Sequence, residues 1–268
     1  SGACRIKVVA AISPTSNFMI FGITPVDWKD LQNKAAEVFD DMGCKTYVEK
    51  SIETARGTVN IDVYVEDVNS IPSSIILCEC KHWERPVPQS AVHSFRTVIS
   101  DCGAHHGMII SKNGFQSGAY DASAHTNIKI LNWDEFQEEM YPRWIECMIN
   151  KVKALTRKLV DYSNEENDEF GKLISSFNAS EQEEFKRLLE RGLQFSISMM
   201  GIMANIKEKS PPIHINDFSS SGKMDLIAFD SKKALFEFVI RNAENIISSF
   251  VQLYEDVKTR HHKNGNSL

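Results

Sequence analysis

The stretch SIILCECK, residues 74–81, constrains the fold more than any other part of this 268-residue sequence. Its nearly continuous apolar run is typical of a β-strand that is covered on both faces. The run ends in Glu79 and Lys81, which lie two residues apart and therefore share a strand face with Ile75 and Leu77. An acid and a base on a buried face are costly unless they have partners or a chemical task. The sequence thus allows two interpretations, a salt bridge at a strand end or an active site.

Asp62 supplies a second carboxylate that the same sheet can bring close to Glu79. It lies in VNIDVYVE, residues 59–66, whose alternation predicts a second strand. We expect two opposite faces on this strand, Val59, Ile61, Val63 and Val65 on one and Asn60, Asp62, Tyr64 and Glu66 on the other. Neighbouring strands would bring Asp62, Glu79 and Lys81 together at a sheet edge.

These three residue types suit the hydrolysis of phosphodiester bonds. Two carboxylates bind a hard divalent cation through oxygen. Such a cation polarises a phosphoryl oxygen and lowers the pKa of its bound water. A lysine beside it can orient the attacking water or stabilise developing negative charge.

The flanking patterns predict a mixed α/β sheet. We expect a helix over 24–42, capped by Thr24 with Pro25 in its first turn, with Trp28 in its apolar stripe and Gln32 at the stripe's edge. The remaining predicted elements are strands at 44–50, 59–66, 74–81, 107–111 and 127–131, helices at 88–100 and 114–124, and a helix opening at Asn132 or Asp134. The order α-β-β-β-α-β-α-β implies a mixed sheet with helices on both faces.

The pattern becomes mainly helical from about residue 141. Ser163 with Glu166 and Ser180 with Glu183 fit capping boxes. We also expect a long amphipathic helix at 231–260 and a short hairpin between two loops within 207–223. The apolar run at 195–203 suits core packing or a dimer seam. The predicted organisation is an N-terminal segment at 1–24 and an α/β domain at 25–140. A helical domain for oligomerisation or partner binding follows at 141–268.

Charge and cysteine usage narrow the class of protein. The net charge is −6, which is not the footprint of an obvious nucleic-acid binder, so a polyanion would need a local basic patch. The six cysteines form no CxxC pair, which favours a reduced, cytoplasmic protein and makes a zinc site improbable. The sequence has no apolar run long enough for a transmembrane helix.

The chain from 25 to 140 resembles the Mrr-like (type IV) restriction endonucleases of the PD-(D/E)xK nuclease superfamily. The resemblance is carried by Asp62…Glu79-Cys80-Lys81, which looks like the D…ExK core of that superfamily. It extends in unbroken order through WKDLQNKAAEVFDDMGC, ARGTVNIDVYV, CECKHWERPVPQSAV, DCGAHHGMIISKNGFQSGAYDASAHTNIKI and WDEF. ExK alone is a weak signal, whereas this full series is specific.

The resemblance implies a restriction-endonuclease-like αβββαβ core, Mg²⁺ with Mn²⁺ as a substitute, and DNA cleavage in bacterial restriction or antiphage defence. Asp62 and Glu79 match the family's metal ligands, together with the backbone carbonyl of Cys80. Lys81 matches the catalytic lysine, and Gln89 matches a frequent accessory position that is otherwise just a solvated helix start. The sequence departs from many relatives at Gln32, where they carry Glu, and at His105-His106.

Four further polar residues are candidates for contact with nucleic acid. Arg56 and Arg85 flank the expected site, and Lys112 and Gln116 lie in a turn before a helix. The competing interpretations are solvated arginines and a simple helix cap around Gly114. For the whole chain the alternatives to a DNA endonuclease are an inactive nuclease-fold module that binds nucleic acid or protein, and a nuclease that acts on RNA.

Overall fold

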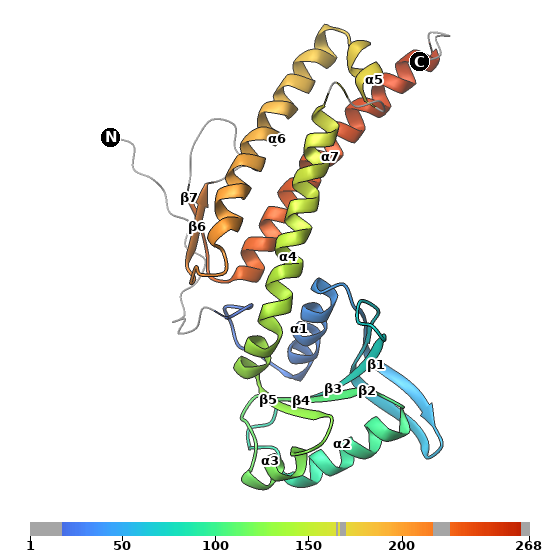
Figure 1. Ribbon diagram of the computed structural model, residues 1–268, viewed down its shortest axis with the longest axis vertical. Helices are drawn as coiled ribbons and strands as arrows, with labels where there is room; N and C mark the ends of the chain where they lie inside the picture. Colours follow the sequence, from blue (N-terminus) through green and yellow to red (C-terminus); the bar gives the residue numbers. More distant parts are fainter. Residues whose placement is uncertain (1–17, 165, 167–169, 217–225, 264–268) are drawn as a thin grey trace. The chain divides into compact units, whose positions relative to one another are not determined.

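The computed structural model describes residues 18–164, 166, 170–216 and 226–263, which fall into two compact units, 18–148 and 149 onward (Figure 1). Most of the expected N-terminal segment, residues 1–17, lies outside the described part of the chain. The first unit contains α1 (Trp28–Asp41), β1 (Lys45–Thr54), β2 (Gly57–Asp67), β3 (Ser74–Lys81), α2 (Gln89–Asp101), β4 (His106–Ser111), α3 (Ser117–Ser123), β5 (Ile128–Asn132) and the first part of α4 (Trp133–Ser163).

The first unit is built on a five-stranded mixed sheet in the order β1-β2-β3-β4-β5. The first three strands are antiparallel, and β4 and β5 then run parallel to β3. Helix α1 covers one face of the sheet, while α2 and α3 cover the other (Figure 1). The predicted mixed sheet with helices on both faces is confirmed.

The two faces of β3 contact different helices. Leu77 is fully buried in a cluster with Val92, Phe95 and Ile99 of α2, so its side of the strand faces α2. Cys78 pairs with Val63 of β2 and faces the opposite side, where α1 packs. Glu79 and Lys81 follow Leu77 in the alternation and therefore lie on the α2 side.

Helix α1 begins later than the sequence pattern indicated. Asp27 is its N-cap, and the Asp27 Oδ1 accepts a hydrogen bond of 2.8 Å from the backbone N–H of Asp30. The predicted cap at Thr24 with Pro25 in the first turn is therefore wrong. Trp28 also leaves the predicted apolar stripe, since 52% of its surface is exposed. Helix α3 is likewise shorter than its predicted range of 114–124.

Contacts within the first unit continue beyond residue 140. The Arg143 guanidinium donates two hydrogen bonds to the carboxylate of Asp67 at the end of β2, one of them 2.8 Å long. The Trp144 indole N–H donates to the Asp41 Oδ2 at the end of α1, at 2.8 Å. The fully buried Trp144 ring therefore fixes α4 against α1.

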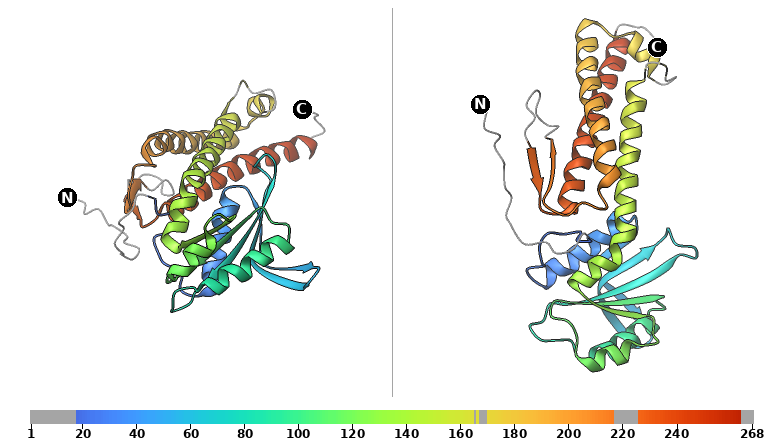
Figure 2. Two further views of the ribbon diagram at one scale, coloured as in Figure 1. Left: turned by 60° about the horizontal axis from the view of Figure 1, so that its bottom comes forward. Right: turned by 60° about the vertical axis from the view of Figure 1, so that its left-hand side comes forward.

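The second unit is helical with one small hairpin. It contains the rest of α4, α5 (Gly171–Ser175), α6 (Ala179–Asn205), β6 (Ile213–Asn216), β7 (Leu226–Phe229) and α7 (Lys232–Lys263). Helices α6 and α7 run side by side (Figure 2). The antiparallel pairing of β6 with β7 confirms the predicted hairpin, although its loop at 219–223 lies outside the described residues.

Both predicted capping boxes in the second unit are wrong. Ser163 is the last residue of α4 rather than the start of a helix. Helix α6 is capped by Asn178 with Glu181, two residues before the predicted pair at Ser180. Among the helices described, none is both long and apolar enough to cross a membrane.

Candidate active site

Strand β2 changes the face on which its apolar residues lie at Asp62. Ile61 packs in the α2 cluster, whereas Val63 faces α1. The predicted regular alternation, with Ile61 and Val63 on one face, is therefore wrong. The register of β1 and β2 explains the change, because Lys50 pairs with Ile61 and Val48 with Val63 while Glu49 and Asp62 between them do not pair.

Glu49 marks the same irregularity on the neighbouring strand. Its φ is +54°, a left-handed conformation that costs a residue with a Cβ atom about 1–2 kcal/mol. Such strain persists where the surrounding structure imposes it, and it occurs most often at functional sites. Asp62 and Glu49 thus lie opposite each other at a local break in an otherwise paired hairpin.

Asp62 bridges to β3 at the point where the two strands stop pairing. The paired register of β2 with β3 ends at Val63 and Cys78, one residue short of Asp62 and Glu79. The Asp62 Oδ2 accepts a hydrogen bond of 2.7 Å from the backbone N–H of Cys80. The side chain thereby replaces a missing backbone partner and fixes the carboxylate where the pairing of β2 with β3 ends.

Glu79 and Lys81 form an ion pair on the α2 side of β3. Burial raises the pKa of the Glu79 carboxyl; its hydrogen bond with Lys81 lowers that pKa, and the nearby charge of Asp62 raises it again. The Lys81 ammonium also lies 5.1 Å from the centre of the Trp83 ring. The salt bridge of the simpler interpretation is present, and Glu79 also lies within electrostatic reach of Asp62.

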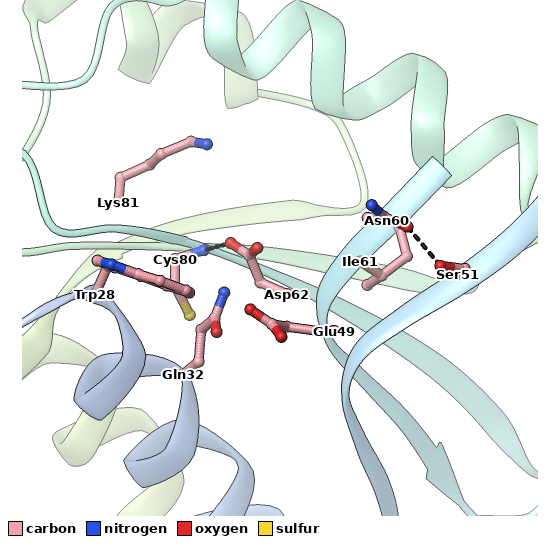
Figure 3. Close-up of a pocket in the computed structure, with 9 residues that line it drawn as sticks. All are labelled: Trp28, Gln32, Glu49, Ser51, Asn60, Ile61, Asp62, Cys80 and Lys81. Atoms are coloured by element: carbon pink, nitrogen blue, oxygen red, sulfur yellow. Dashed lines mark hydrogen bonds between the residues drawn. The ribbon is translucent and has the colours of Figure 1, made fainter. Parts of the chain in front are cut away.

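A pocket of about 540 Å³ opens beside these residues (Figure 3). Four elements supply its lining, namely Trp28 and Gln32 from α1, Glu49 and Ser51 from β1, Asn60, Ile61 and Asp62 from β2, and Cys80 and Lys81 from β3. Gln32 and Glu49 extend toward Asp62, whereas Lys81 extends away from this group (Figure 3). The pocket therefore joins Asp62, Cys80 and Lys81 to several residues that the sequence did not indicate, whereas Glu79 is not part of its lining.

Gln32 lies deeper than the sequence indicated. Only 3% of its surface is exposed, and its Oε1 has no hydrogen-bond partner among the described residues. A buried acceptor without a donor costs about 1–3 kcal/mol. The edge of the α1 stripe, where the sequence placed Gln32, is therefore buried in the structure.

The oxygen atoms of the site fit a hard divalent cation. Asp62 and Glu79 supply two carboxylates, and Asp62 also shares the pocket with the buried Gln32 Oε1. Within the described ranges, no three His, Cys, Asp or Glu side chains are grouped so that they alone would hold a metal. An ion here would therefore need carbonyl, amide or water oxygens to complete its shell.

The other predicted site residues lie outside the pocket lining. The Gln89 amide lies 3.1 Å from the His93 Nε2 and packs against Gly118, with no hydrogen bond to Glu79 or Lys81 among the described residues. Arg56, at the tip of the β1–β2 hairpin, lies 3.5 Å from the Asp101 carboxylate.

The remaining three candidates flank β3 and α3. Lys112 forms an ion pair of 2.6 Å with Glu84, so part of its charge is already neutralised. Arg85 is exposed in the loop after β3. Gln116 is exposed at the N-cap of α3 and makes no capping hydrogen bond.

Glu49 and Trp83 are the residues that sequence reasoning missed. Glu49 lies within an expected strand whose pattern gives no sign of a left-handed residue, since such a conformation is predicted only for Gly, Asn or Asp. Trp83 lies two residues after the end of β3, and an aromatic residue at that distance from Lys81 was a usable signal.

Comparison with known proteins finds a family match, which lies within the first unit. Residues 23–140 match the model of the Mrr catalytic family, which is described as a restriction endonuclease. No curated protein matches the chain. Among solved structures, the chain is similar to the crystal structure of a protein of unknown function, AF1548, with 15% identity, a TM-score of 0.38, and coverage of 83% of this chain and 99% of that one. A likeness of that size supports no conclusion about this chain.

Proposed function

We propose, from the premise that residues 23–140 form a restriction-endonuclease domain of the Mrr type, that the protein is a metal-dependent endonuclease that hydrolyses phosphodiester bonds of DNA. The observation that carries the proposal is the meeting of Asp62, Glu79 and Lys81 where β2 and β3 stop pairing. A purely structural ion pair would explain Glu79 and Lys81, but it would not explain a third charged group held beside them at an open pocket.

Asp62 and Glu79, with the backbone carbonyl of Cys80, would hold Mg²⁺, for which Mn²⁺ can substitute. When bound, such an ion polarises the phosphoryl group and lowers the pKa of its water. Asp62 is pre-oriented for this task because the Cys80 N–H fixes one of its two oxygens. Glu79 must be ionised to act as a ligand, and the adjacent Lys81 favours its charged form.

The proposed catalytic role of Lys81 depends on where its ammonium group is held. Its ammonium contacts both the Glu79 carboxylate and the face of Trp83. From that position it would donate a hydrogen bond to the attacking water or to a phosphate oxygen and stabilise developing negative charge. Gln89 would take its accessory role only after its side chain gives up the contact with the His93 ring.

Contacts with DNA would come from a small set of basic and polar residues. Arg85 is exposed beside the loop that carries Trp83, and Lys112 lies near it with Glu84. Gln116 and Arg56 would extend the surface along α3 and the hairpin tip. Because the whole chain carries a net charge of −6, we expect weak DNA binding that falls as salt rises.

The helical region 141–268 would assemble the protein as a homo-oligomer or bind a regulatory partner. A domain with one cutting site needs two such domains to cut both strands of a duplex, and an unrestrained nuclease endangers its own cell. We therefore include a role in restriction or antiphage defence in the proposal. A cytoplasmic location also belongs to it, since the described cysteines are all free thiols.

The test is incubation of the full chain with supercoiled plasmid, linear duplex, single-stranded DNA and RNA, each with Mg²⁺, Mn²⁺ or EDTA. We expect cleavage of DNA that EDTA stops and that Glu79→Gln removes. Glu53→Gln is the matched control, because Glu53 is exposed on β1 and does not line the pocket. Cleavage that persists in EDTA, or that Glu79→Gln leaves at the level of the control, would sink the proposal, and cleavage of RNA alone would change the substrate.

A further inference from the structure

Trp28 is the most exposed of the four tryptophans of the chain. Trp133 and Trp144 are almost fully buried, and each contacts another aromatic ring. Trp83 is 37% exposed and lies against a lysine ammonium. Trp28 is 52% exposed, and among the described residues neither an aromatic ring nor a cation contacts it. Exposure of one apolar side chain indicates nothing by itself, so its surroundings decide what it could bind.

The surroundings of the Trp28 ring are those of the proposed active site. The ring lines the same pocket as Asp62, Cys80 and Lys81. Figure 3 shows it at the end of the pocket where Cys80 and Lys81 lie, across from Asn60. The pocket volume of about 540 Å³ lies in the range of sites for one small molecule, about 300–1,000 Å³, so a single nucleotide has the right size. A phosphate held at Asp62 and Lys81 would bring its attached nucleoside into the space that this ring lines.

The backbone that carries the ring is held on two sides. The Pro25 carbonyl oxygen lies 3.1 Å from the His82 Nε2, so the segment before α1 contacts the residue that follows β3. The Asp30 Oδ2 accepts a hydrogen bond of 2.8 Å from the Val26 N–H, and the Asp27 Oδ1 accepts one from the Asp30 N–H. Two carboxylates therefore already occupy N–H groups at the start of α1, where a phosphate would otherwise bind. We expect the ligand beside the ring to be flat and uncharged rather than an anion.

We propose that Trp28 stacks on an unpaired nucleobase next to the scissile phosphate, so that the site takes single-stranded DNA or a nucleotide that has left its duplex stack. Every nucleobase has a flat aromatic face that can stack on an indole ring, whatever the sequence. In an intact duplex the neighbouring bases cover that face, and the nucleotide must be unstacked before a protein ring can reach it. The inference rests on the proposed function for the place of the phosphate.

The test is fluorescence anisotropy of a labelled single-stranded oligonucleotide, and of the same strand in a duplex, titrated with the full chain in EDTA to prevent cleavage. We expect Trp28→Ala to weaken single-strand binding about tenfold and duplex binding by less than about twofold, because only an unpaired base loses its stacking partner. Trp28→Phe keeps an aromatic face and should restore most of the affinity. Tyr47→Ala is the matched control, since Tyr47 is 44% exposed on β1 and does not line the pocket. Circular dichroism checks that each variant is folded.

The outcomes separate this inference from the proposed function. Single-strand binding by Trp28→Ala that equals that of Tyr47→Ala overturns the stacking and leaves the nuclease proposal intact. An equal loss of single-strand and duplex binding in Trp28→Ala also overturns the inference, because the ring would then not distinguish an unpaired base. Absence of cleavage under every metal condition, with single-strand binding still weakened in Trp28→Ala, overturns the nuclease and keeps the stacking.

Discussion

Carboxylates beside a pocket characterise the first unit, and a cluster of stacked aromatic rings characterises the second. In the first unit, the Gln32 amide oxygen lines a pocket and has no partner among the described residues, and Glu79, a carboxylate with a raised pKa, pairs with Lys81 of the same lining. The second unit packs aromatic rings against one another, among them Tyr162, Phe250 and Tyr254. Buried polar groups also occur in the second unit, where Lys232 is fully buried, so the carboxylates beside the pocket are the reason that the proposed chemistry is assigned to the first unit.

The largest effect should follow loss of a carboxylate from the first unit. Asp62→Asn should reduce cleavage by at least about 10⁴-fold, or some 5 kcal/mol of activation free energy, because a divalent ion loses an anionic ligand. The unfolding free energy should change little, since the amide retains an acceptor for the Cys80 N–H. Single-turnover cleavage and thermal denaturation measure the two quantities, and wild-type rates in the variant would remove Asp62 from the site.

The opposite effect is expected in the second unit. Phe250 is fully buried and contacts the rings of Phe185 and Tyr254, so Phe250→Ala should cost about 3–5 kcal/mol of unfolding free energy. Urea denaturation followed by circular dichroism measures the loss. Mn²⁺ affinity of the folded protein should be unchanged, and a fall in that affinity would contradict the division of tasks between the units.

Loss of the ion pair between Arg143 and Asp67 should reduce the unfolding free energy by a smaller amount. The hydrogen bonds from Arg143 lower the pKa of the buried Asp67 carboxyl. Arg143→Met should cost about 2 kcal/mol of unfolding free energy, between the values for exposed and buried pairs, because the Arg143 side chain is 43% exposed. Arg187→Met removes the exposed pair of Arg187 with Glu184 in the second unit and serves as the control, with a cost near zero.

The difference in unfolding free energy between wild type and Arg143→Met should depend on pH in one direction. A carboxyl whose pKa is lowered by folding contributes stability above its ordinary pKa of 3.8, and this contribution is lost as pH falls through the lowered value. The stability gap between wild type and Arg143→Met should therefore be full near neutral pH and narrow in acid. A gap that widens in acid would mean that the pair does not set the Asp67 pKa.

Replacement of Gln32 should raise the unfolding free energy modestly while weakening the response to Mn²⁺. Gln32→Met keeps the volume and removes the buried acceptor without a partner, so it should raise the unfolding free energy by about 1 kcal/mol in EDTA. The same change should reduce the stabilisation that added Mn²⁺ provides. Thermal denaturation with and without Mn²⁺ measures both, and a destabilised protein in EDTA would show that the amide is satisfied in solution.

The smallest effect concerns Trp83. Its ring lies 5.1 Å from the Lys81 ammonium, and a contact of this kind contributes about 1 kcal/mol at a partly exposed site. Trp83→Leu should lower turnover about fivefold by loosening Lys81, with Mn²⁺ affinity unchanged. Trp83→Phe should restore most of the rate, and a failure of Phe to do so would point to packing rather than to the ring face.

Local patterns predicted the sheet, whereas long-range contacts completed the site. The run at 74–81 coincides with β3, since apolar residues between polar ends mark a covered strand. The change of face at Asp62 could not be predicted, because it depends on the left-handed Glu49 in the neighbouring strand. The Arg143–Asp67 pair joins residues far apart in the chain, and no spacing rule connects them. Asn178 with Glu181 and Ser180 with Glu183 both fit the capping-box pattern, so the pattern alone could not identify which pair caps α6.

The hydrogen bond from the Cys80 N–H to Asp62 makes that backbone proton a built-in probe. Its partner is a side-chain carboxylate rather than a neighbouring strand, so its nuclear magnetic resonance frequency depends on the charge of one residue. Addition of a diamagnetic ion such as Mg²⁺ should shift this single resonance before any substrate is present. If the ion binds Asp62 as proposed, this backbone proton reports its arrival without an attached label.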